Sequence, residues 1–354
     1  MNHAAFVRVN ESHFSSLVRC LGLLRARASL ARRTRRRFKL SDGCLPNGTN
    51  EGTVARTNPF ARRNQRETYR AARVSIRGMR RVQTHHLFLP LQQELISLLR
   101  GLGESDWSRP TLARRWSVKD IAAHLLDTDL RRLSSQRDGY RPSPATKNAD
   151  DYKDLVAFIN QLNASWVAAA KRLSPRVLVD LLEWSGPRVA ELFASLPPDG
   201  PAHFPVAWAG EERSANWMDT GREYTEKWHH QAQIREAVGA QGLNSRRWLG
   251  PVLELSMHAL PHAFRNVEAA RGSALGVRID GEAGGAWHIR MEDGGWKLLE
   301  GEAPEASACI RLDGETAWRL FFNALDSEDA KRRVSSSGDE ELCDAFFAVR
   351  SVMV

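Results

Sequence analysis

The sequence contains little cysteine and no long uninterrupted apolar run. Its 354 residues include only four cysteines, Cys20, Cys44, Cys309 and Cys343, and none of them is paired closely with another. This distribution provides neither a disulfide framework nor a cysteine-based zinc site, and it fits a reducing compartment. A membrane helix needs about 18 or more consecutive apolar residues, and every apolar run here is shorter. We therefore expect a cytoplasmic protein that is not integral to a membrane.

Motifs that define several common enzyme classes are also absent. The sequence has no Gly-x-Ser-x-Gly nucleophile elbow, no Walker phosphate-binding loop and no Rossmann glycine fingerprint. Serine and histidine occur, but they form no persuasive nucleophile–base set. Any chemistry must therefore come from another kind of site.

Positive charge is concentrated at one end of the chain. The whole sequence has 51 Lys and Arg against 42 Asp and Glu, a formal net charge of +9. Residues 1–78 contain 17 of the basic residues and only 4 of the acidic ones, which leaves 34 against 38 in the remainder. The body of the protein is therefore mildly acidic, and we expect no nucleic-acid partner.

The basic segment, residues 1–80, is predicted to be a disordered extension. It is rich in arginine, and the Gly/Asn/Thr-rich stretch at 41–58 has no apolar period. It has few aromatic residues for a nucleic-acid-binding arm, whereas its arginine-rich, acid-poor composition resembles an organellar targeting peptide. The interpretation that we favour is that Met79 is the true start, because the recognisable patterns begin just after it.

Apolar residues recur at the helical period from His86 onward. The periodicity predicts amphipathic helices at about 86–101, 117–137, 151–173, 175–196 and 216–238. Ser117 and Asp120 resemble a capping box at the start of the second helix. Gly186 and Pro187 are expected to break or kink the fourth. The fold class is therefore mainly α in this part, with a helical bundle at 84–248.

The last hundred residues change to the period of β-strands. Residues 275–279, 287–291 and 296–299 are apolar in alternation and are separated by glycines, which predicts an antiparallel meander. A fourth strand at 308–312 and helices at about 315–325 and 339–352 follow. We expect a small antiparallel α+β domain, residues 250–354, which a helix at 250–267 joins to the bundle.

Candidate metal ligands lie in the helix predicted at 216–238. Glu226 and His230 are four residues apart, so they project from the same helical face one turn apart. A solvent-exposed hydrogen-bonded pair has the same spacing. His124, on the apolar face of the second helix, is by itself typical of a core histidine, yet it offers the third ligand that a site across a bundle needs. Three such N/O ligands suit Zn²⁺ or a similar divalent ion and leave one coordination position open.

Other spacings of the same residue types are less informative. Glu226 and His229 have the three-residue spacing of di-iron carboxylate bundles, but no matching pair occurs on another helix. Glu254 and His258 repeat the four-residue spacing within the joining helix, where packing or surface exposure explains them. The neighbouring pairs His85 with His86, and His258 with His262, are interpreted in the same way.

Two segments resemble the metal-binding helices of a known family. They are RRWSVKDIAAHLLDTD at 114–129 and REYTEKWHHQAQIREAVG at 222–239, and Trp107 and Thr111 precede the first. Together they resemble the mycothiol-dependent maleylpyruvate isomerase family, within the DinB-like four-helix bundle superfamily. From about Thr84 to the end the chain is similar to this family, including its C-terminal α+β domain of sterol-carrier-like architecture. The resemblance implies that His124, Glu226 and His230 bind a divalent metal, the same three residues that spacing proposes.

The chain departs from the family pattern at two places. Arg114, Arg115 and Trp116 stand where the family often has Pro-Gly-Trp, which changes the loop but keeps the indole. Gln233 stands where the family often has an aspartate, and an uncharged amide would support the histidine ligand less strongly.

The resemblance implies a thiol-dependent transferase or isomerase. Its cosubstrates are mycothiol or another low-molecular-weight thiol and a small-molecule electrophile. The metal deprotonates the thiol, and the thiolate then adds to a double bond, opens a ring or displaces a leaving group. Alternatives are a metal-dependent hydrolase on the same ligands, or a non-enzymatic metal- or ligand-binding module. Candidates for lining a cleft, which fit core or rim packing equally well, are Trp208, Trp217, Arg213 and Arg222.

Overall fold

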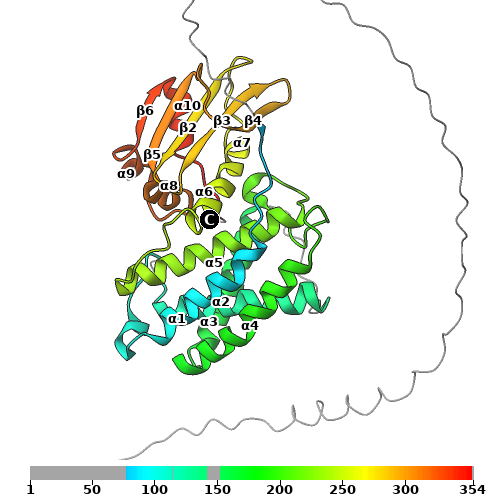
Figure 1. Cartoon of the computed structure of the whole chain (residues 1–354), viewed down its shortest axis with the longest axis vertical. Coiled ribbons are helices and arrows are strands. Elements are labelled where there is room, and N and C mark those ends of the chain that lie inside the picture. The colour runs from blue at the N-terminus through cyan, green and yellow to red at the C-terminus, as the bar shows by residue number, and fades with distance from the viewer. Residues whose placement is uncertain (1–76, 114, 142–151, 353–354) are drawn as a thin grey trace, which may run out of the picture. The chain divides into compact units, whose positions relative to one another are not determined.

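The computed structural model describes residues 77–113, 115–141 and 152–352 (Figure 1). The predicted basic extension therefore lies outside the described residues up to position 76. The predicted helices all form, and their bounds are α1 Phe88–Arg100, α2 Val118–Arg132, α3 Tyr152–Ala170, α4 Pro175–Ser195 and α5 Asn216–Val238. Helix α2 contacts α3, α4 and α5, while α1 contacts α4 and α5. The predicted helical bundle is thus confirmed.

The ends of the two helices that carry the candidate ligands follow from local sequence. The Ser117 side chain accepts a hydrogen bond from the Asp120 backbone N–H, and the Asp120 carboxylate accepts one from the Ser117 N–H. This is the predicted capping box, and it starts α2 one turn and a half before His124. Helix α5 ends at Gly239, whose positive φ of 69° forms the left-handed C-cap that glycine adopts without strain.

The expectation that α4 breaks at Gly186–Pro187 is wrong. Helix α4 runs continuously through both residues. A proline removes one backbone hydrogen bond from a helix and crowds the preceding turn, so nearby carbonyls need other donors. Pro187 leaves the Glu183 carbonyl without its helical donor, and side chains bond to the carbonyls on either side of it: Gln92 and Ser185 donate to Leu182, and Arg188 donates to Trp184.

Short helical segments flank the long helices of the bundle. One-turn 3₁₀ segments lie at His85–Leu87, Glu104–Ser108 and Ala207–Ala209, and α2 continues as a π-helical segment at Leu133–Arg137. The joining helix predicted at 250–267 is divided into α6 Leu249–Ser256, a 3₁₀ turn at Met257–Ala259 and α7 Leu260–Ala263.

A sheet follows the helices. Its strands are β1 Arg77–Gly78, β2 Ala274–Asp280, β3 Gly285–Glu292, β4 Gly295–Glu300, β5 Ala308–Asp313 and β6 Ser335–Gly338, in the spatial order β1-β4-β3-β2-β5-β6. Strands β2, β3 and β4 form the predicted antiparallel meander. The helices of this part are α8 Gly314–Phe321, α9 Ser327–Lys331 and α10 Glu340–Phe346, and α8 and α10 pack against β5.

The sheet is mixed rather than wholly antiparallel. Strand β5 pairs with β2 in parallel, with Val277 opposite Ile310. The chain leaves β4 on one side of the meander and crosses through residues 301–307 before it enters β5, so β5 runs in the same direction as β2. Two strands were not predicted: the serine-rich β6 lacks apolar alternation, and the two-residue β1, within the segment expected to be disordered, pairs with the edge of β4.

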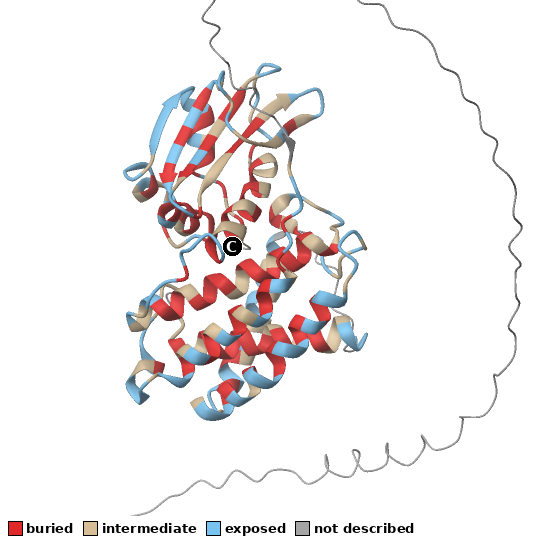
Figure 2. Cartoon of the chain, in the orientation of Figure 1, coloured by how far each residue is buried: buried red, intermediate tan, exposed pale blue. Residues whose placement is uncertain are grey.

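The apolar core is divided between two clusters. One lies within the bundle, around α1, α2 and α4, and includes Ile121, Leu125 and Leu182. The other is continuous from the bundle into the sheet, from Trp228 on α5 to Ile289 on β3. Figure 2 shows the buried residues on the facing sides of the helices and in alternation along the strands. The α5 helix therefore lies between a purely helical core and one that it shares with the sheet.

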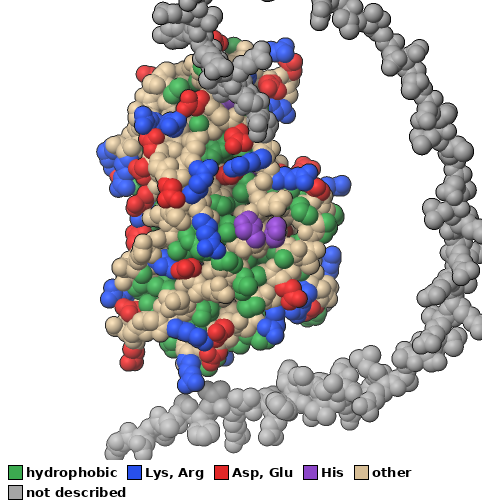
Figure 3. Space-filling model, in the orientation of Figure 1, with side chains coloured by type: hydrophobic (Ala, Val, Ile, Leu, Met, Phe, Trp, Pro, Cys, Tyr) green, Lys and Arg blue, Asp and Glu red, His purple; other side chains and the backbone are tan. Residues whose placement is uncertain are grey.

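Charge is distributed evenly on the face of the molecule in view. Figure 3 shows basic and acidic side chains intermixed there, with apolar side chains between them. Among the described residues no helix is long and apolar enough to cross a membrane.

Candidate metal centre

The candidate ligands lie between α2 and α5, two helices in contact. His230 Nε2 lies 3.5 Å from Glu226 Oε2, one turn earlier on α5. The His124 ring, on α2, lies 4.7 Å from the His230 ring between centroids, at an interplanar angle of 78°. The structure therefore places His230 next to Glu226 and next to His124.

Trp116 covers this group from the loop before α2. Its ring lies 4.8 Å from that of His124 and 6.2 Å from that of His230. The loop is held by Thr111, whose backbone and hydroxyl groups both donate to the Trp116 carbonyl. The indole that the sequence retains from the family pattern thus forms one wall of the site.

Burial disfavours the charged forms of the candidate ligands. It lowers the pKa of His230 to about 4 and the pKa of His124 well below its usual value, so both imidazoles are neutral at pH 7. It raises the pKa of the Glu226 carboxyl to about 7. Neutral imidazoles with free lone pairs, next to a carboxylate that a positive charge would stabilise, are suited to a divalent cation.

A fourth residue, His229, competes for the role of third ligand. Ligand atoms of Glu226, His229 and His230 all lie within 4.8 Å of one another. Gln233 distinguishes the two histidines: its side-chain oxygen lies 2.9 Å from His230 Nδ1, and its nitrogen lies 2.9 Å from His229 Nε2. An amide oxygen only accepts and an amide nitrogen only donates. His230 is thus protonated at Nδ1, which leaves the Nε2 lone pair directed to Glu226.

The same amide removes the free lone pair of His229. Its Nε2 accepts from Gln233, so the neutral ring carries its proton on Nδ1. Both His124 and His229 have a buried Nδ1 without a hydrogen-bond partner, but that of His229 carries the proton. The distance between the His124 and His230 rings is also suitable, because two imidazoles on one ion at metal–nitrogen distances of about 2.1 Å have centroids roughly 5 Å apart. The residues therefore fit a divalent ion, with His124 favoured over His229.

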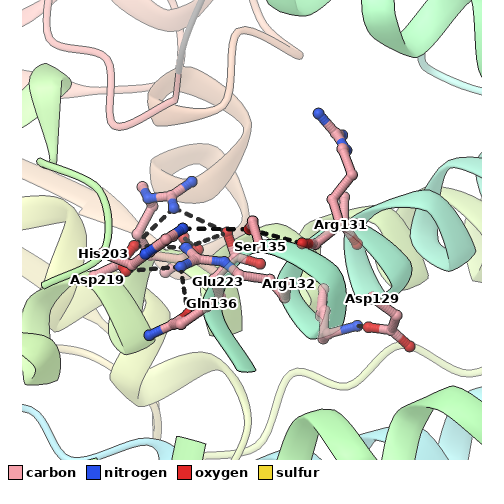
Figure 4. Close-up of polar contacts among 12 residues, drawn as sticks. Asp129, Arg131, Arg132, Ser135, Gln136, His203, Asp219 and Glu223 are labelled. Carbon is pink, nitrogen blue, oxygen red and sulfur yellow. Dashed lines mark hydrogen bonds and ion pairs between the residues drawn. The ribbon is translucent and has the colours of Figure 1, made fainter. Parts of the chain in front are cut away.

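A buried ionic network extends from the site along α2 and α5 (Figure 4). Arg132 is 3% exposed, and its guanidinium donates to both oxygens of Asp219 and to Glu223. Burial alone raises the pKa of Glu223, but Arg132 and Arg222 outweigh it and lower this pKa to about 2. Asp129, which is fully buried, accepts hydrogen bonds from Lys227 and Ser185. These pairs fix α2 against α5, and single-sequence periodicity gave no signal for them.

The proposed cleft residues do not form one lining. Trp208 is buried with its indole nitrogen unpartnered, and Trp217 packs against His258 at 5.5 Å between centroids. Arg213 is exposed. Arg222 pairs with Asp219 and Glu223 and is among the charges that act on Glu226. Only Arg222 is therefore near the candidate ligands by these contacts.

Comparisons with solved structures show weak similarity. Crystal structures of the mycothiol-dependent maleylpyruvate isomerase and of a mutant of it align with a TM-score of 0.43 and 12% identity, over 72% of this chain and 92% of that one. A stereoselective inverting sec-alkylsulfatase from Pseudomonas sp. aligns with a TM-score of 0.19 and 11% identity, over 67% of this chain and 44% of that one. These scores carry no argument about function.

Comparisons of sequence are more specific. No curated protein sequence matches the chain. The family model described as the mycothiol maleylpyruvate isomerase N-terminal domain matches residues 88–235, which include α1 to α5 almost completely and all three candidate ligands. The helical part of the chain is therefore similar to the N-terminal domain of the mycothiol maleylpyruvate isomerase family.

Proposed function

We propose that the protein is an enzyme that binds one divalent metal ion, with Zn²⁺ the preferred candidate, through His124, Glu226 and His230. The observation that carries this proposal is the arrangement of His230, whose Nε2 lone pair is directed to Glu226 while its ring adjoins that of His124. The family match to residues 88–235 supports it independently. Three protein ligands leave a position for a second molecule.

The reaction we propose is thiol-dependent transfer to, or isomerisation of, a small electrophile. A bound divalent ion would supply Lewis acidity that lowers the pKa of a low-molecular-weight thiol, such as mycothiol. Gln233 fixes the tautomer of His230, and Trp116 shields the site from water. Arg222 provides a positive charge near Glu226, which favours the carboxylate form. Such thiols are kept reduced in the cytoplasm, where we place the protein.

The first test is metal content. We expect purified protein to contain about one divalent ion per chain and His230→Ala to lose it, because two ligands hold zinc poorly. His262→Ala is the matched control, since His262 lies on α7 outside the ligand group. Elemental analysis after dialysis gives the answer, and equal metal in wild type and His230→Ala would refute the site.

The second step of the same test is the thiol assay. Mycothiol and other thiols are offered with maleylpyruvate, an epoxide and a haloarene, with the metal present or removed by a chelator. Turnover that requires both metal and thiol supports the proposal. Metal-dependent hydrolysis of esters or amides without thiol would favour the hydrolase instead, and binding without turnover would favour a non-enzymatic module.

A further inference from the structure

Two aromatic side chains at the end of α8, Trp318 and the C-cap residue Phe322, pack against His229, the neighbour of the candidate ligand His230. The Phe322 ring lies 4.7 Å from that of His229 between centroids, and the Trp318 ring lies 6.2 Å from it. Both aromatic residues are 4% exposed. About two turns further along α5, Glu236 forms an ion pair with Arg319 at 2.8 Å. The contact between α8 and α5 is therefore buried where the two aromatic rings meet His229, and an ion pair lies at its edge.

His229 is poorly fixed by hydrogen bonds alone. Its Nε2 accepts from Gln233, but its buried Nδ1 has no partner. An imidazole with one hydrogen bond can still rotate about it, so the packing of neighbouring rings must determine its orientation. Phe322 and Trp318 provide that packing on the side of α8.

The orientation of His229 has consequences for His230. Gln233 has one amide, which bridges the two histidines, with its nitrogen facing His229 and its oxygen facing His230. If the His229 ring turned away, the amide would lose one of the two partners that hold it in this orientation. His230 could then carry its proton on either nitrogen, and the lone pair toward Glu226 would no longer be guaranteed.

We propose that Trp318 and Phe322 are positioning residues of the metal centre, acting through His229 and Gln233 on His230; this inference rests on the metal site proposed above. The sheet part thereby contributes to the affinity of a site whose ligands all lie in the bundle. Nothing in the ligand spacing indicates it, because Phe322 is more than ninety residues beyond His230 in the sequence.

The test compares two phenylalanines that are equally buried. Phe322→Ala removes the ring that packs on His229, whereas Phe347→Ala removes one that packs on Phe346, away from α5. Zn²⁺ affinity is measured by competition with a chromophoric chelator. We expect Phe322→Ala to weaken Zn²⁺ binding about tenfold. This is the lower end of the loss in metal affinity that follows mutation of a residue supporting a metal ligand. Phe347→Ala should stay within about twofold of wild type, and Phe322→Leu should recover part of the loss.

A second readout does not depend on the metal. Imidazole ¹⁵N chemical shifts of the metal-free protein report which nitrogen of His230 carries the proton. We expect the Nδ1–H form in wild type and in Phe347→Ala, and a mixture of tautomers in Phe322→Ala. If Phe322→Ala does not fold, Trp318→Phe takes its place with a smaller shift in the same direction.

The possible failures are distinct. Wild-type affinity together with wild-type His230 shifts in folded Phe322→Ala would overturn the positioning role while leaving the metal site intact. An equal loss of affinity in Phe347→Ala would also overturn it, because the effect would then be general destabilisation. Absence of Zn²⁺ binding by the wild type would refute the proposed function itself.

Discussion

His258 illustrates at the scale of one residue how burial makes stability depend on pH. Its Nε2 is buried without a partner next to Trp217, and burial lowers its pKa to about 4. In the unfolded chain a histidine has a pKa near 6.5, so the unfolded state binds the proton more readily. The stability contributed by neutral His258 is therefore complete above about pH 6.5 and is lost as the pH falls toward 4.

We predict that His258→Gln flattens this dependence. An amide does not titrate, so the variant should lose about 2 kcal/mol less unfolding free energy than wild type between pH 7 and pH 5. Urea unfolding of the metal-free proteins at several pH values measures it. Other buried histidines titrate equally in both proteins and cancel in the difference. If the unfolding free energies of the two proteins changed equally with pH, His258 would not contribute to the pH dependence of stability.

The candidate ligands were proposed from the sequence and stay a prediction, whereas the contacts that support them could not be predicted. Glu226 and His230 share a face because a helix repeats every 3.6 residues, and His124 follows from the amphipathic pattern of α2. The role of Gln233 depends on the direction of one amide between two rings, and spacing does not encode that direction. Gln233, which stands where the family pattern often has an aspartate, contacts His230. It also contacts His229 and so bridges the two rings.

At the scale of elements, the buried ionic network joins α2 to α5. Arg132 and its neighbour Arg131 provide a matched pair, because both form ion pairs with carboxylates but only Arg132 is buried. Figure 4 shows the contacts of Arg132 with Asp219 and Glu223. Removing one partner of a buried pair leaves an uncompensated charge, whereas a more exposed pair contributes little. Asp219 and Glu223 would both lose their main partner without Arg132.

We predict that Arg132→Met lowers the unfolding free energy by about 3–5 kcal/mol. Arg131→Met, which breaks the more exposed pair with Asp127, should cost less than about 1 kcal/mol. Both are measured by urea unfolding near pH 7. A cost for Arg132→Met no larger than that for Arg131→Met would mean that Arg222 compensates the two carboxylates by itself.

Elements were predictable where one local pattern decides them. Helix α5 begins and ends as expected, because the apolar period and Gly239 both mark it. The break expected at Pro187 does not occur, and a contact from elsewhere in the chain that periodicity does not show, from Gln92 on α1 to the Leu182 carbonyl, lies at that turn. The parallel pairing of β5 with β2 was missed because strand direction depends on where residues 301–307 cross, which no alternation shows.

At the scale of the whole molecule, the bundle and the sheet share one apolar core. The cluster that includes Trp228 and Trp248 is continuous with Ile289 and Phe321. Whether residues 84–248 and 250–354 behave as separate domains, as the sequence predicts, depends on this shared core. A unit that buries its apolar surface against another loses that stabilisation when the other unfolds.

We predict that the two parts unfold in one cooperative transition. Urea unfolding is followed by far-ultraviolet circular dichroism, which α-helices dominate, and by hydrogen exchange of peptides from β2 to β5. Ile289→Ala removes a fully buried side chain from β3 and should lower stability by about 2–5 kcal/mol. If the shared core couples the two parts energetically, the urea midpoints measured by circular dichroism and by hydrogen exchange decrease equally in Ile289→Ala. A decrease confined to the strands would show that the bundle is an independent domain, and the aromatic contact of α8 with His229 would then have to be maintained without cooperative folding.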